Sequence, residues 1–493
     1  MKPFARSVLR ASSPNRWLAV ALVACVGFTT GCKDEDLPVG AEFGDACAPA
    51  DETPCVEGLV CEARAGGSGD DAYICAGPVE IRGMVMDAID ETPIAGARVS
   101  ALDDTGAPVT DVAISDADGN YVLGIAIARD SDGNPATALT LTLSGAALDY
   151  QLYPSGLQPA FPISTADVVD DTDDHSSVIE NASTTIALLP LEDPSGFTIS
   201  GRIGAKGAEG VEQTSGTLVV AEGSSSTYTI ADRSGEFVLF NVPTGSNTIR
   251  GYHGGLNIVP ETVELSADLS GVVLEFGTEG LATVNGTVSI VDAPGDSLTS
   301  VVLIPSAVFS PVFEFGPVPF GLRAPEPGIA ANVSGAWSIT GVPEGTYKII
   351  PSLENDGLVR DPDTGIAGTE IVEITVGAGE TLDVQEGFKV TGALAVFSPG
   401  RDGPEEVSGA VTFEFEDDAS EERYVIVVHD ALGNEIWRDE QIPGITGSPT
   451  VTVDYGGPAL TPGMYYRFQA TSWRMGSALS RTEDLRGVFV YAD

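Results

Sequence analysis

The sequence predicts an all-β protein built from several β-sandwich domains in series. Val, Thr, Ile and Ser dominate the ordered stretches in alternating patterns typical of strands, and helical patterns are absent. The 58 Gly and 32 Pro residues supply many turns. Two short signals also recur along the chain, and a chain of 493 residues forms several hydrophobic cores rather than one.

The first segment is typical of a secretory signal peptide. Lys2 and three arginines precede an apolar run of 12 residues, Trp17 to Phe28, and small residues follow it. The run is shorter than the ~20 apolar residues that span a bilayer. We therefore expect residues 1–31 to be a signal peptide that is cleaved.

The residues at the end of this segment resemble the lipobox of bacterial lipoproteins, in which a cysteine receives a diacylglycerol before cleavage in front of it. The resemblance rests on Gly31 and Cys32, and it departs at Thr29, where the family has a larger aliphatic residue. It implies that Cys32 is lipidated and attaches the chain to a membrane by two or more acyl chains. The alternative is ordinary cleavage nearby, with Cys32 free or in a disulfide.

Residues 32–44 predict a flexible tether, because they are charged and contain Pro and Gly. Lys33 followed by the acids 34–36 resembles the export signal of surface-displayed Gram-negative lipoproteins. Lys33 also differs from the Asp that resembles an inner-membrane retention signal. Together they imply the outer membrane, on the cell surface or otherwise on its periplasmic face.

The chain is strongly acidic. Residues 1–31 contain four positive charges and no negative one, so their removal takes the formal charge from −48 to −52. This charge argues against nucleic-acid binding and against electrostatic binding to anionic lipid. A solvated acidic surface that keeps an exterior protein soluble accounts for it, although a saline habitat or bridging by divalent cations would also fit.

Residues 45–77 predict a small disulfide-rich module that contains Cys47, Cys55, Cys61 and Cys75. An even number of closely spaced cysteines in an exported chain is typical of a disulfide framework, and about 30 residues hold no core unaided. Of the three possible pairings we favour Cys47–Cys61 with Cys55–Cys75. A zinc site is the alternative, disfavoured by irregular spacing and the absence of a nearby histidine. We expect a rigid collar, with receptor binding as the other role.

Two signals recur after this module: a strand around a glycine, and a turn followed by an aromatic strand. The copies are Gly83 with Gly119 and Tyr121, Gly201 with Gly235 and Phe237, and Gly286 with Gly335 and Trp337. The glycine signal occurs a fourth time, more weakly, at Gly392. The glycine permits close approach of a neighbouring backbone, and the aromatic side chain points inward. V-P-x-G turns at 242–245 and 342–345 are expected to begin the next hairpin. The copies predict sandwiches over 79–195, 196–279 and 280–388.

The first copy resembles the carboxypeptidase regulatory-like domain, a transthyretin-like sandwich of seven strands. The matching features are Gly83, the strand Pro93–Val99 and the turn Asp118–Tyr121. The resemblance covers residues 79–388 and is strongest over 79–125. It implies an accessory or spacer domain, although some structural relatives with a similar sandwich bind starch-like glycans.

Residues 389–493 predict one more sandwich, with a hairpin about Gly433–Asn434. The stretch Leu460–Ser472 resembles the F-strand region of fibronectin type III domains, and Tyr466 lies where the tyrosine corner would be. The expected fold class is therefore all-β, with serial immunoglobulin-like or transthyretin-like sandwiches after a disulfide-rich module.

The sequence contains no recognisable catalytic machinery. His175, His253 and His429 fall in three different expected domains, which argues against Ser-His, Cys-His and two-histidine metal sites. Common nucleotide-binding, hydrolase and protease motifs are also absent. We therefore predict a chain that is not an enzyme and uses no cofactor or metal. A hydrolase with two carboxylates in a cleft is the remaining alternative.

Two acidic turns, Ser115–Asn120 and Asp130–Asn134, resemble calcium-binding loops. Neither matches the EF-hand pattern, and turn chemistry accounts for both without a metal. The acidic stretch Asp167–His175 is interpreted as a solvated loop.

The strongest candidate for binding is the aromatic loop, Ser306–Gly321, which carries Phe309, Phe313, Phe315 and Phe320. We favour burial of these side chains against their own sandwich. The alternative is an exposed aromatic patch for a protein partner or a sugar.

Two functions remain open at this stage. The first is a non-enzymatic lipoprotein whose sandwiches act as a stalk and interaction scaffold for an unknown partner. The second is a glycan-binding lipoprotein that uses the aromatic loop, or Trp337, Trp437 and Trp473, as its platform. Exposed, coplanar aromatic side chains would favour the second function.

Overall fold

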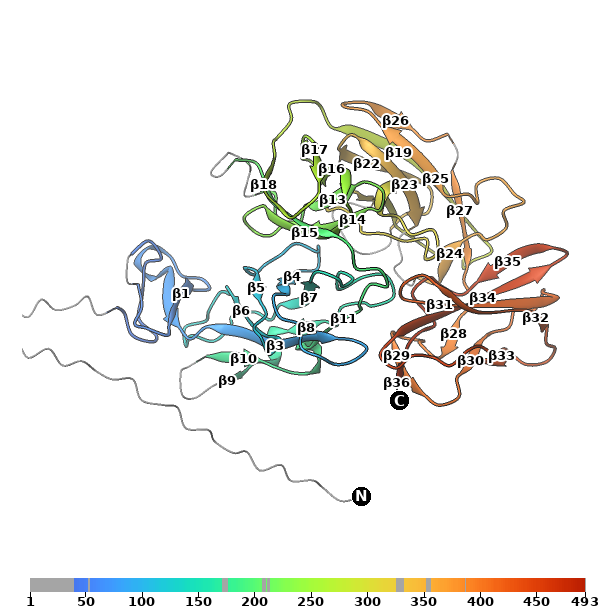
Figure 1. Cartoon of the computed structure of the whole chain (residues 1–493), viewed down its shortest axis with the longest axis horizontal. Helices are drawn as coiled ribbons and strands as arrows, with labels where there is room; N and C mark the ends of the chain where they lie inside the picture. Colours follow the sequence, from blue (N-terminus) through green and yellow to red (C-terminus); the bar gives the residue numbers. More distant parts are fainter. Residues whose placement is uncertain are drawn as a thin grey trace, which may run out of the picture. The chain divides into compact units, whose positions relative to one another are not determined.

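The computed structural model describes residues 40–51, 54–170, 176–205, 210, 213–324, 332–351, 356–385 and 387–492 (Figure 1). The expected signal peptide, Cys32, most of the tether and residues 171–175, including His175, lie outside the described residues. The fold is all-β, as the sequence predicts. Within the described residues, no helix has the length and apolar character needed to cross a membrane.

The first sandwich follows the disulfide module. One sheet has β3 (Val79–Asp87) at its centre, flanked by β6 (Asn120–Ile125) on one side and by β10 (Ser177–Ile179) and β11 (Ile186–Leu188) on the other, with β9 (Val169–Asp170) beside β10. The other sheet has the order β5 (Ala113–Ile114), β4 (Arg98–Leu102), β7 (Thr140–Ala146), β8 (Ile163–Ser164). Two 3-10 helices, η2 (Thr165–Asp167) and η3 (Ala182–Thr184), lie between strands.

One sheet of the second sandwich has the strand order β15 (Glu236–Val242), β12 (Phe197–Ile203), β18 (Leu269–Leu274). Its other sheet has the order β14 (Thr227–Ile230), β13 (Leu218–Glu222), β16 (Gly245–Tyr252), β17 (Glu261–Leu265). One sheet of the third sandwich has the order β22 (Ala336–Val342), β19 (Ala282–Val291), β27 (Phe388–Gly392), β24 (Leu358–Arg360), and β26 (Thr381–Asp383) also pairs with β19. Its other sheet has β21 (Arg323–Ala324), β20 (Val301–Pro305), β23 (Gly345–Pro351), β25 (Val372–Val376).

These three sandwiches share one strand order. In each, the first long strand pairs with the aromatic strand in antiparallel fashion and with the last strand in parallel fashion. Among its described residues, the second sandwich forms a sheet of three strands and a sheet of four. Seven is the number of strands that the resemblance to carboxypeptidase regulatory-like domains implies.

The two recurring sequence signals are cross-strand partners. Gly83 lies opposite Tyr121, Gly201 opposite Phe237 and Gly286 opposite Trp337. A Cβ atom on Gly83 would lie 2.6 Å from Tyr121 Oη, and one on Gly286 would lie 2.7 Å from Trp337 Cε2. The glycine is therefore needed because the aromatic side chain occupies the space that a Cβ atom would take.

The last strand of each sandwich is interrupted opposite the same glycine. β10 pairs with residues 79–81 of β3 and β11 with residues 85–87, which leaves residues 82–84 paired with neither. In the second sandwich the register of β12 and β18 shifts between Ser200 and Gly201. In the third, β26 and β27 pair on either side of Gly286. The aromatic side chain thus fits beside a break in the sheet, where Tyr121 Oη donates a hydrogen bond to Thr184 O at 2.6 Å.

The V-P-x-G turns join strands of different sheets, β15 to β16 and β22 to β23. Proline lacks the N–H group that ladder pairing needs, which suits a connection that leaves its sheet. The strand that begins at each turn glycine then pairs in antiparallel fashion with a later strand, β16 with β17 and β23 with β25, as the sequence predicts. The x-Gly-x match at Gly392 needs correction: it is not a first strand, because β27 pairs with β19 and β24 and so completes the third sandwich.

One sheet of the C-terminal sandwich has the strand order β28 (Val396–Ser398), β30 (Thr412–Glu416), β33 (Thr450–Asp454). The other has the order β29 (Glu405–Ser408), β36 (Val488–Ala492), β34 (Tyr465–Arg474), β31 (Arg423–Asp430), β32 (Glu435–Pro443), and β35 (Ser477–Arg481) also pairs with β34. Tyr466 is buried at the start of β34, and its Oη accepts a hydrogen bond of 2.9 Å from Thr461 N. This is the geometry of a tyrosine corner, as the sequence predicts.

Substitution of Gly83 tests the pairing of glycine with aromatic residue. We expect Gly83→Ala to destabilise the first sandwich by about 1–3 kcal/mol, because the new methyl group overlaps Tyr121 and the backbone at Thr184. The matched control is Gly124→Ala in β6, where a Cβ atom meets nothing within 4 Å, and the expected change is within about 0.5 kcal/mol. Urea unfolding followed by hydrogen exchange of peptides from β3 measures both. Equal effects of the two substitutions would contradict the steric explanation.

Candidate functional site: the aromatic loop and the domain junctions

The aromatic loop, Ser306–Gly321, follows β20 and starts with a 3-10 helix, η5 (Ser306–Val308). Prolines at 311, 317 and 319 prevent regular pairing of its backbone, so the loop projects from its sheet. Its four phenylalanines have different surroundings. Phe309 packs against a small cluster of its own sandwich, formed by Val302, Ile304 and Ile350.

Phe313 leaves its own sandwich and enters the C-terminal one. It is 7% exposed and belongs to the hydrophobic cluster that contains Phe413, Phe468 and Phe489, against which Phe315 also packs. Leu157 and Leu189 of the first sandwich belong to the same cluster. The loop therefore joins the first, third and C-terminal sandwiches.

A buried arginine fixes Phe313 in this position. The guanidinium of Arg467 in β34 is 1% exposed and lies 5.1 Å from the centre of the Phe313 ring. Its Nη2 donates to Val312 O at 3.3 Å and its Nη1 to Asp484 O at 2.9 Å. The ring also meets His429 edge-on, with 6.4 Å between ring centres. Burial lowers the pKa of His429, and the charge of Arg467 lowers it further.

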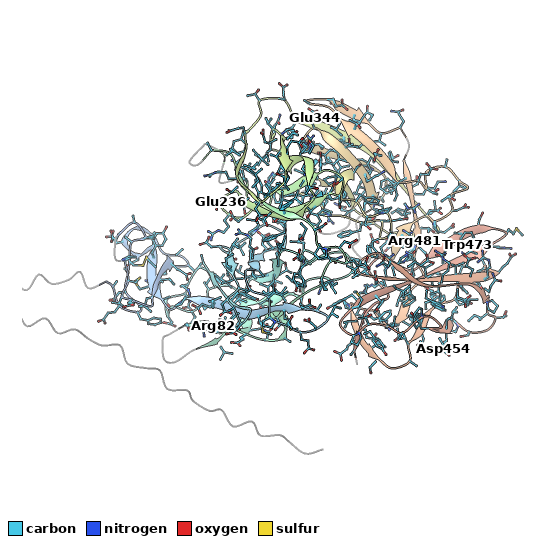
Figure 2. The ribbon with its side chains drawn as sticks, in the orientation of Figure 1. Arg82, Glu236, Glu344, Asp454, Trp473 and Arg481 are labelled. Atoms are coloured by element: carbon cyan, nitrogen blue, oxygen red, sulfur yellow. A yellow bond between two sulfur atoms is a disulfide. The ribbon has the colours of Figure 1, made fainter. Side chains whose placement is uncertain are left out.

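The next residue, Glu314, forms an ion cluster across the same junction. Its backbone has φ = +50°, and its carboxylate accepts hydrogen bonds from Arg360 Nε at 2.8 Å and from Arg481 Nη2 at 2.7 Å. Arg481, labelled in Figure 2, lies on β35 of the C-terminal sandwich and also contacts Asp484 at 3.2 Å. Burial alone would raise the pKa of Glu314, but Arg481 and Arg360 outweigh it and hold this pKa far below its usual range.

At its other end, the aromatic loop contacts the second sandwich. Phe320 is 39% exposed and stacks on His253, with ring centres 4.8 Å apart. Gly254 N donates to Phe320 O at 2.7 Å. Burial lowers the pKa of His253. The loop thus contacts its own sandwich and all three others.

The second and third sandwiches are also joined through β13, which is buried on both faces. Val219 and Ala221 lie in the core of the second sandwich, whereas Leu218 and Val220 lie in the core cluster of the third. Tyr252 belongs to that third cluster and meets Tyr347 edge-on, with ring centres 5.6 Å apart.

Contacts of the first sandwich complete a closed circuit. Asn241 of the second sandwich accepts a hydrogen bond from Asp149 N at 2.7 Å and donates one to Tyr150 O at 2.9 Å. Asn434 of the C-terminal sandwich donates to Glu192 at 2.9 Å. The sandwiches are therefore serial in sequence but interlocked in structure, from first to second, third and C-terminal and back to the first.

The tryptophans form no common platform in the described part of the chain. Trp337 is buried opposite Gly286. Trp437 packs on Phe413 and Tyr455. Trp473, labelled in Figure 2, is covered by Arg423, whose guanidinium lies 5.0 Å from the centre of the Trp473 ring. The exposed, coplanar arrangement that would favour sugar binding is thus not found among them.

Both calcium-like turns are members of a recurring aspartate turn. In each, the Asp Oδ1 accepts hydrogen bonds from the N–H groups two and four residues later, and a glycine at the fourth position has positive φ. The five aspartates are Asp103, Asp116, Asp130, Asp232 and Asp430. The backbone hydrogen bond from Asn120 lowers the pKa of Asp116, and those from Asp132 and Asn134 lower the pKa of Asp130. Turn chemistry therefore accounts for these carboxylates.

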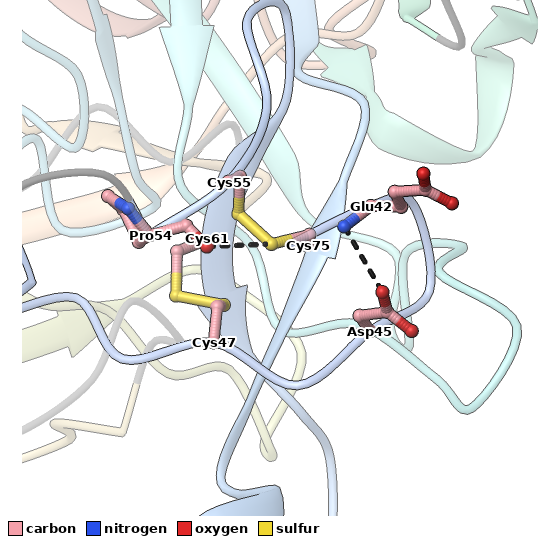
Figure 3. The surroundings of a disulfide bond; sticks show 7 residues. All are labelled: Glu42, Asp45, Cys47, Pro54, Cys55, Cys61 and Cys75. Atoms are coloured by element: carbon pink, nitrogen blue, oxygen red, sulfur yellow. Dashed lines mark hydrogen bonds between the residues drawn. A yellow bond between two sulfur atoms is a disulfide. The ribbon is translucent and has the colours of Figure 1, made fainter. Parts of the chain in front are cut away.

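The disulfides are Cys47–Cys61 and Cys55–Cys75, the pairing favoured from the sequence (Figure 3). Among the described residues, the one group of three potential metal ligands is Cys47, Cys55 and Cys75, which these bonds explain. Cys75 Sγ lies 3.5 Å from Pro54 O, a contact in which a disulfide sulfur has no proton to donate.

No protein-family model matches the chain, and no curated protein matches it. Among solved structures, the chain is 12% identical to the major pilin subunit BcpA of Bacillus cereus, over 64% of this chain and 100% of that one, with a TM-score of 0.17. The TIE protein of Bacillus anthracis is 9% identical over 81% and 68%, with a TM-score of 0.15. GBS52, a minor pilin of Streptococcus agalactiae, is 13% identical over 42% and 100%, with a TM-score of 0.18. Similarities this low establish no functional relationship.

Truncation of Phe313 tests the junction. We expect Phe313→Ala to weaken docking of the C-terminal sandwich by about 3–5 kcal/mol, because a buried aromatic side chain is lost from its core. Phe320→Ala is the control in the same loop and should cost about 1 kcal/mol, the value of one exposed stack. Differential scanning calorimetry should resolve a separate transition for Phe313→Ala. A single transition at the wild-type temperature would show that Phe313 does not join the sandwiches.

The same junction should weaken in acid. The pKa of Glu314 lies far below its ordinary value of 4.5, so the ionised carboxylate stabilises the junction fully above that pH, and this stabilisation is lost progressively as the pH falls from 4.5 towards the folded-state pKa. We expect the radius of gyration, measured by small-angle X-ray scattering, to rise progressively as the pH is lowered below 4.5. Glu314→Gln should be loosened already at neutral pH and respond less. The exposed Glu344→Gln serves as control and should follow the wild type.

Proposed function

We propose that this chain is a non-enzymatic cell-envelope lipoprotein whose β-sandwiches form a scaffold for interaction with another protein. The observation that carries this proposal is the use of the aromatic loop. Phe313, Phe315 and Phe320 make contacts between sandwiches. The aromatic loop, the best candidate for a ligand-binding surface, therefore serves to join the sandwiches. A scaffold requires such fixed junctions, whereas a sugar platform requires open aromatic faces.

The buried ionisable groups support a structural role as well. Glu314 forms ion pairs with both Arg360 and Arg481, and Asp484 pairs with Arg481. Catalytic groups need an accessible position for a substrate, and this cluster lies between packed sandwiches. The two histidines that the structure describes share no site either, since His253 stacks on Phe320 and His429 meets Phe313.

The sequence resemblances extend the proposal. The first three sandwiches are assigned to the carboxypeptidase regulatory-like family, with support from their common strand order and from the repeated pairing of glycine with an aromatic residue. The C-terminal sandwich is assigned to the fibronectin type III type, with support from the bond between Tyr466 and Thr461. Domains of these two kinds are widespread as accessory modules rather than as catalysts.

The envelope location rests on the N-terminal sequence. An apolar segment that ends at Gly31-Cys32, followed by Lys33 and three acids, supports lipidation of Cys32 and display on the outer membrane. Two disulfides and a strongly acidic surface suit an oxidising, exterior compartment. The partner would then be met at the cell surface, or at the periplasmic face of the same membrane.

Protease shaving of intact cells tests this location. We expect the wild-type chain to fractionate with membranes and to be removed by external protease. Cys32→Ala should release it into soluble fractions, because the acyl chains are its only attachment in this proposal. Cys25→Ala, within the expected signal peptide, is the control and should leave attachment unchanged. Membrane attachment of the Cys32→Ala form would contradict the anchor, and protection from protease would place the sandwiches in the periplasm.

A further inference from the structure

The disulfide module and the first sandwich are joined without a spacer. The module contains the hairpin β1 (Val60–Ala63) and β2 (Tyr73–Ala76), with a 3-10 helix, η1 (Gly69–Asp71), between the strands. β3 of the sandwich begins at Val79, and only two residues, Gly77 and Pro78, separate it from the end of β2. Ile74, Cys75, Ala76 and Val79 are all fully or almost fully buried. The chain therefore stays buried from the end of the module to the start of the sandwich.

A buried arginine of the sandwich depends on the module for its counter-charge. Arg129 follows β6 and is 1% exposed. Its Nη1 donates to Gly133 O at 3.1 Å and its Nη2 to Gly77 O at 2.7 Å, while its Nε pairs with the carboxylate of Glu62 in β1. Among the described residues, Glu62 is the one carboxylate in contact with Arg129.

Backbone contacts hold the two parts together at the same point. Arg129 N donates to Ala63 O at 2.8 Å, and Ala65 N donates to Arg129 O at 2.7 Å. Glu62 also accepts a hydrogen bond of 3.3 Å from Ile127 N. β1 thus packs on the segment 127–129, and the ion pair between Glu62 and Arg129 lies at this contact.

The disulfides are what keep Glu62 in place. Cys61, the residue before Glu62, is bonded to Cys47, and Cys75, its cross-strand neighbour in β2, is bonded to Cys55. No hydrophobic cluster of the described residues is formed by the module itself. A segment this small holds its fold through its cross-links, so the hairpin that carries Glu62 should come apart when they are reduced.

We propose that the module is an oxidation-dependent cap of the first sandwich: the two disulfides hold Glu62 against buried Arg129, and the sandwich is fully stable only when both bonds are formed. Formation of each disulfide joins two thiols and releases two protons and two electrons to an oxidising disulfide, which becomes two thiols. Reduction by a dithiol reverses this and leaves four free cysteines. Glu62 then leaves, and Arg129 remains buried without a counter-charge, a strongly unfavourable state.

The biological use of such a cap rests on the proposed export of the chain. A chain made in a reducing compartment would carry a first sandwich that is incompletely stabilised until it is exported and oxidised. Export machinery that passes unfolded chains would benefit from this delay. The cap itself is a property of the purified chain, so its test is independent of where the protein is located.

The test is hydrogen exchange of the purified full chain carrying Cys32→Ala, oxidised or reduced with dithiothreitol. We expect reduction to speed exchange at least about tenfold in peptides covering 126–136 and β6, while peptides from β34 in the C-terminal sandwich stay protected. Loss of protection in the module alone, with residues 126–136 unchanged, would overturn the proposal.

Two substitutions distinguish the effect of the ion pair between Glu62 and Arg129 from the effect of the disulfides. In the oxidised chain, Glu62→Gln should speed exchange at 126–136, because it neutralises the counter-charge and leaves both disulfides intact. Arg129→Met removes the buried charge, so reduction should then loosen the sandwich much less than in the wild type. Wild-type exchange in oxidised Glu62→Gln, or an undiminished effect of reduction in Arg129→Met, would show that the ion pair does not couple the module to the sandwich.

Discussion

The fold depends on one steric constraint: the first long strand of each of the first three sandwiches must carry a glycine opposite a large aromatic side chain. The ring of Tyr121, Phe237 or Trp337 occupies the space where a Cβ atom would be. Because the ring reaches across the first strand, the last strand cannot pair continuously and is broken or shifted at that level. The recurring signals in the sequence are therefore the two halves of one contact, and the break in the last strand is its consequence.

A second constraint acts between the sandwiches. The chain has 72 acidic and only 24 basic side chains, yet its buried arginines lie at contacts between structural parts. Arg129 joins the module to the first sandwich, and Arg467 and Arg481 join the aromatic loop to the C-terminal one. Half-buried Arg98 of the first sandwich faces Asp232 and Glu236 of the second. Each draws together acidic surfaces that would otherwise repel. The same pairs make the junctions dependent on ionisation, because a buried guanidinium is tolerated only with its partners in place.

The sequence is sufficient to predict what local patterns determine. Alternation and turn residues predict the all-β class and the three copies. Cysteine number and spacing predict a disulfide framework but leave three pairings possible. These patterns cannot predict which neighbour an outward-facing side chain will meet. The run Leu218–Ala221 is apolar at every position, a hint that both faces of β13 are buried, but it does not name the third sandwich as the partner. The sequence favours burial of Phe313 against its own sandwich, whereas the cluster that contains it is formed mostly by residues of the C-terminal sandwich, which are distant in the sequence.

Interlocking changes what a scaffold of serial sandwiches can do. Independent domains on flexible linkers would bend at each connection, and each would present its own surface to a partner. Here the aromatic loop contacts all four sandwiches, so a partner would meet surfaces whose relative positions are set by shared cores and buried ion pairs. The loop cannot bind a ligand through Phe313 without opening the junction that Arg467 and Glu314 hold shut. In the proposed scaffold, a partner would therefore bind exposed faces of the strands and turns. The aromatic residues would contribute by fixing the relative positions of those faces.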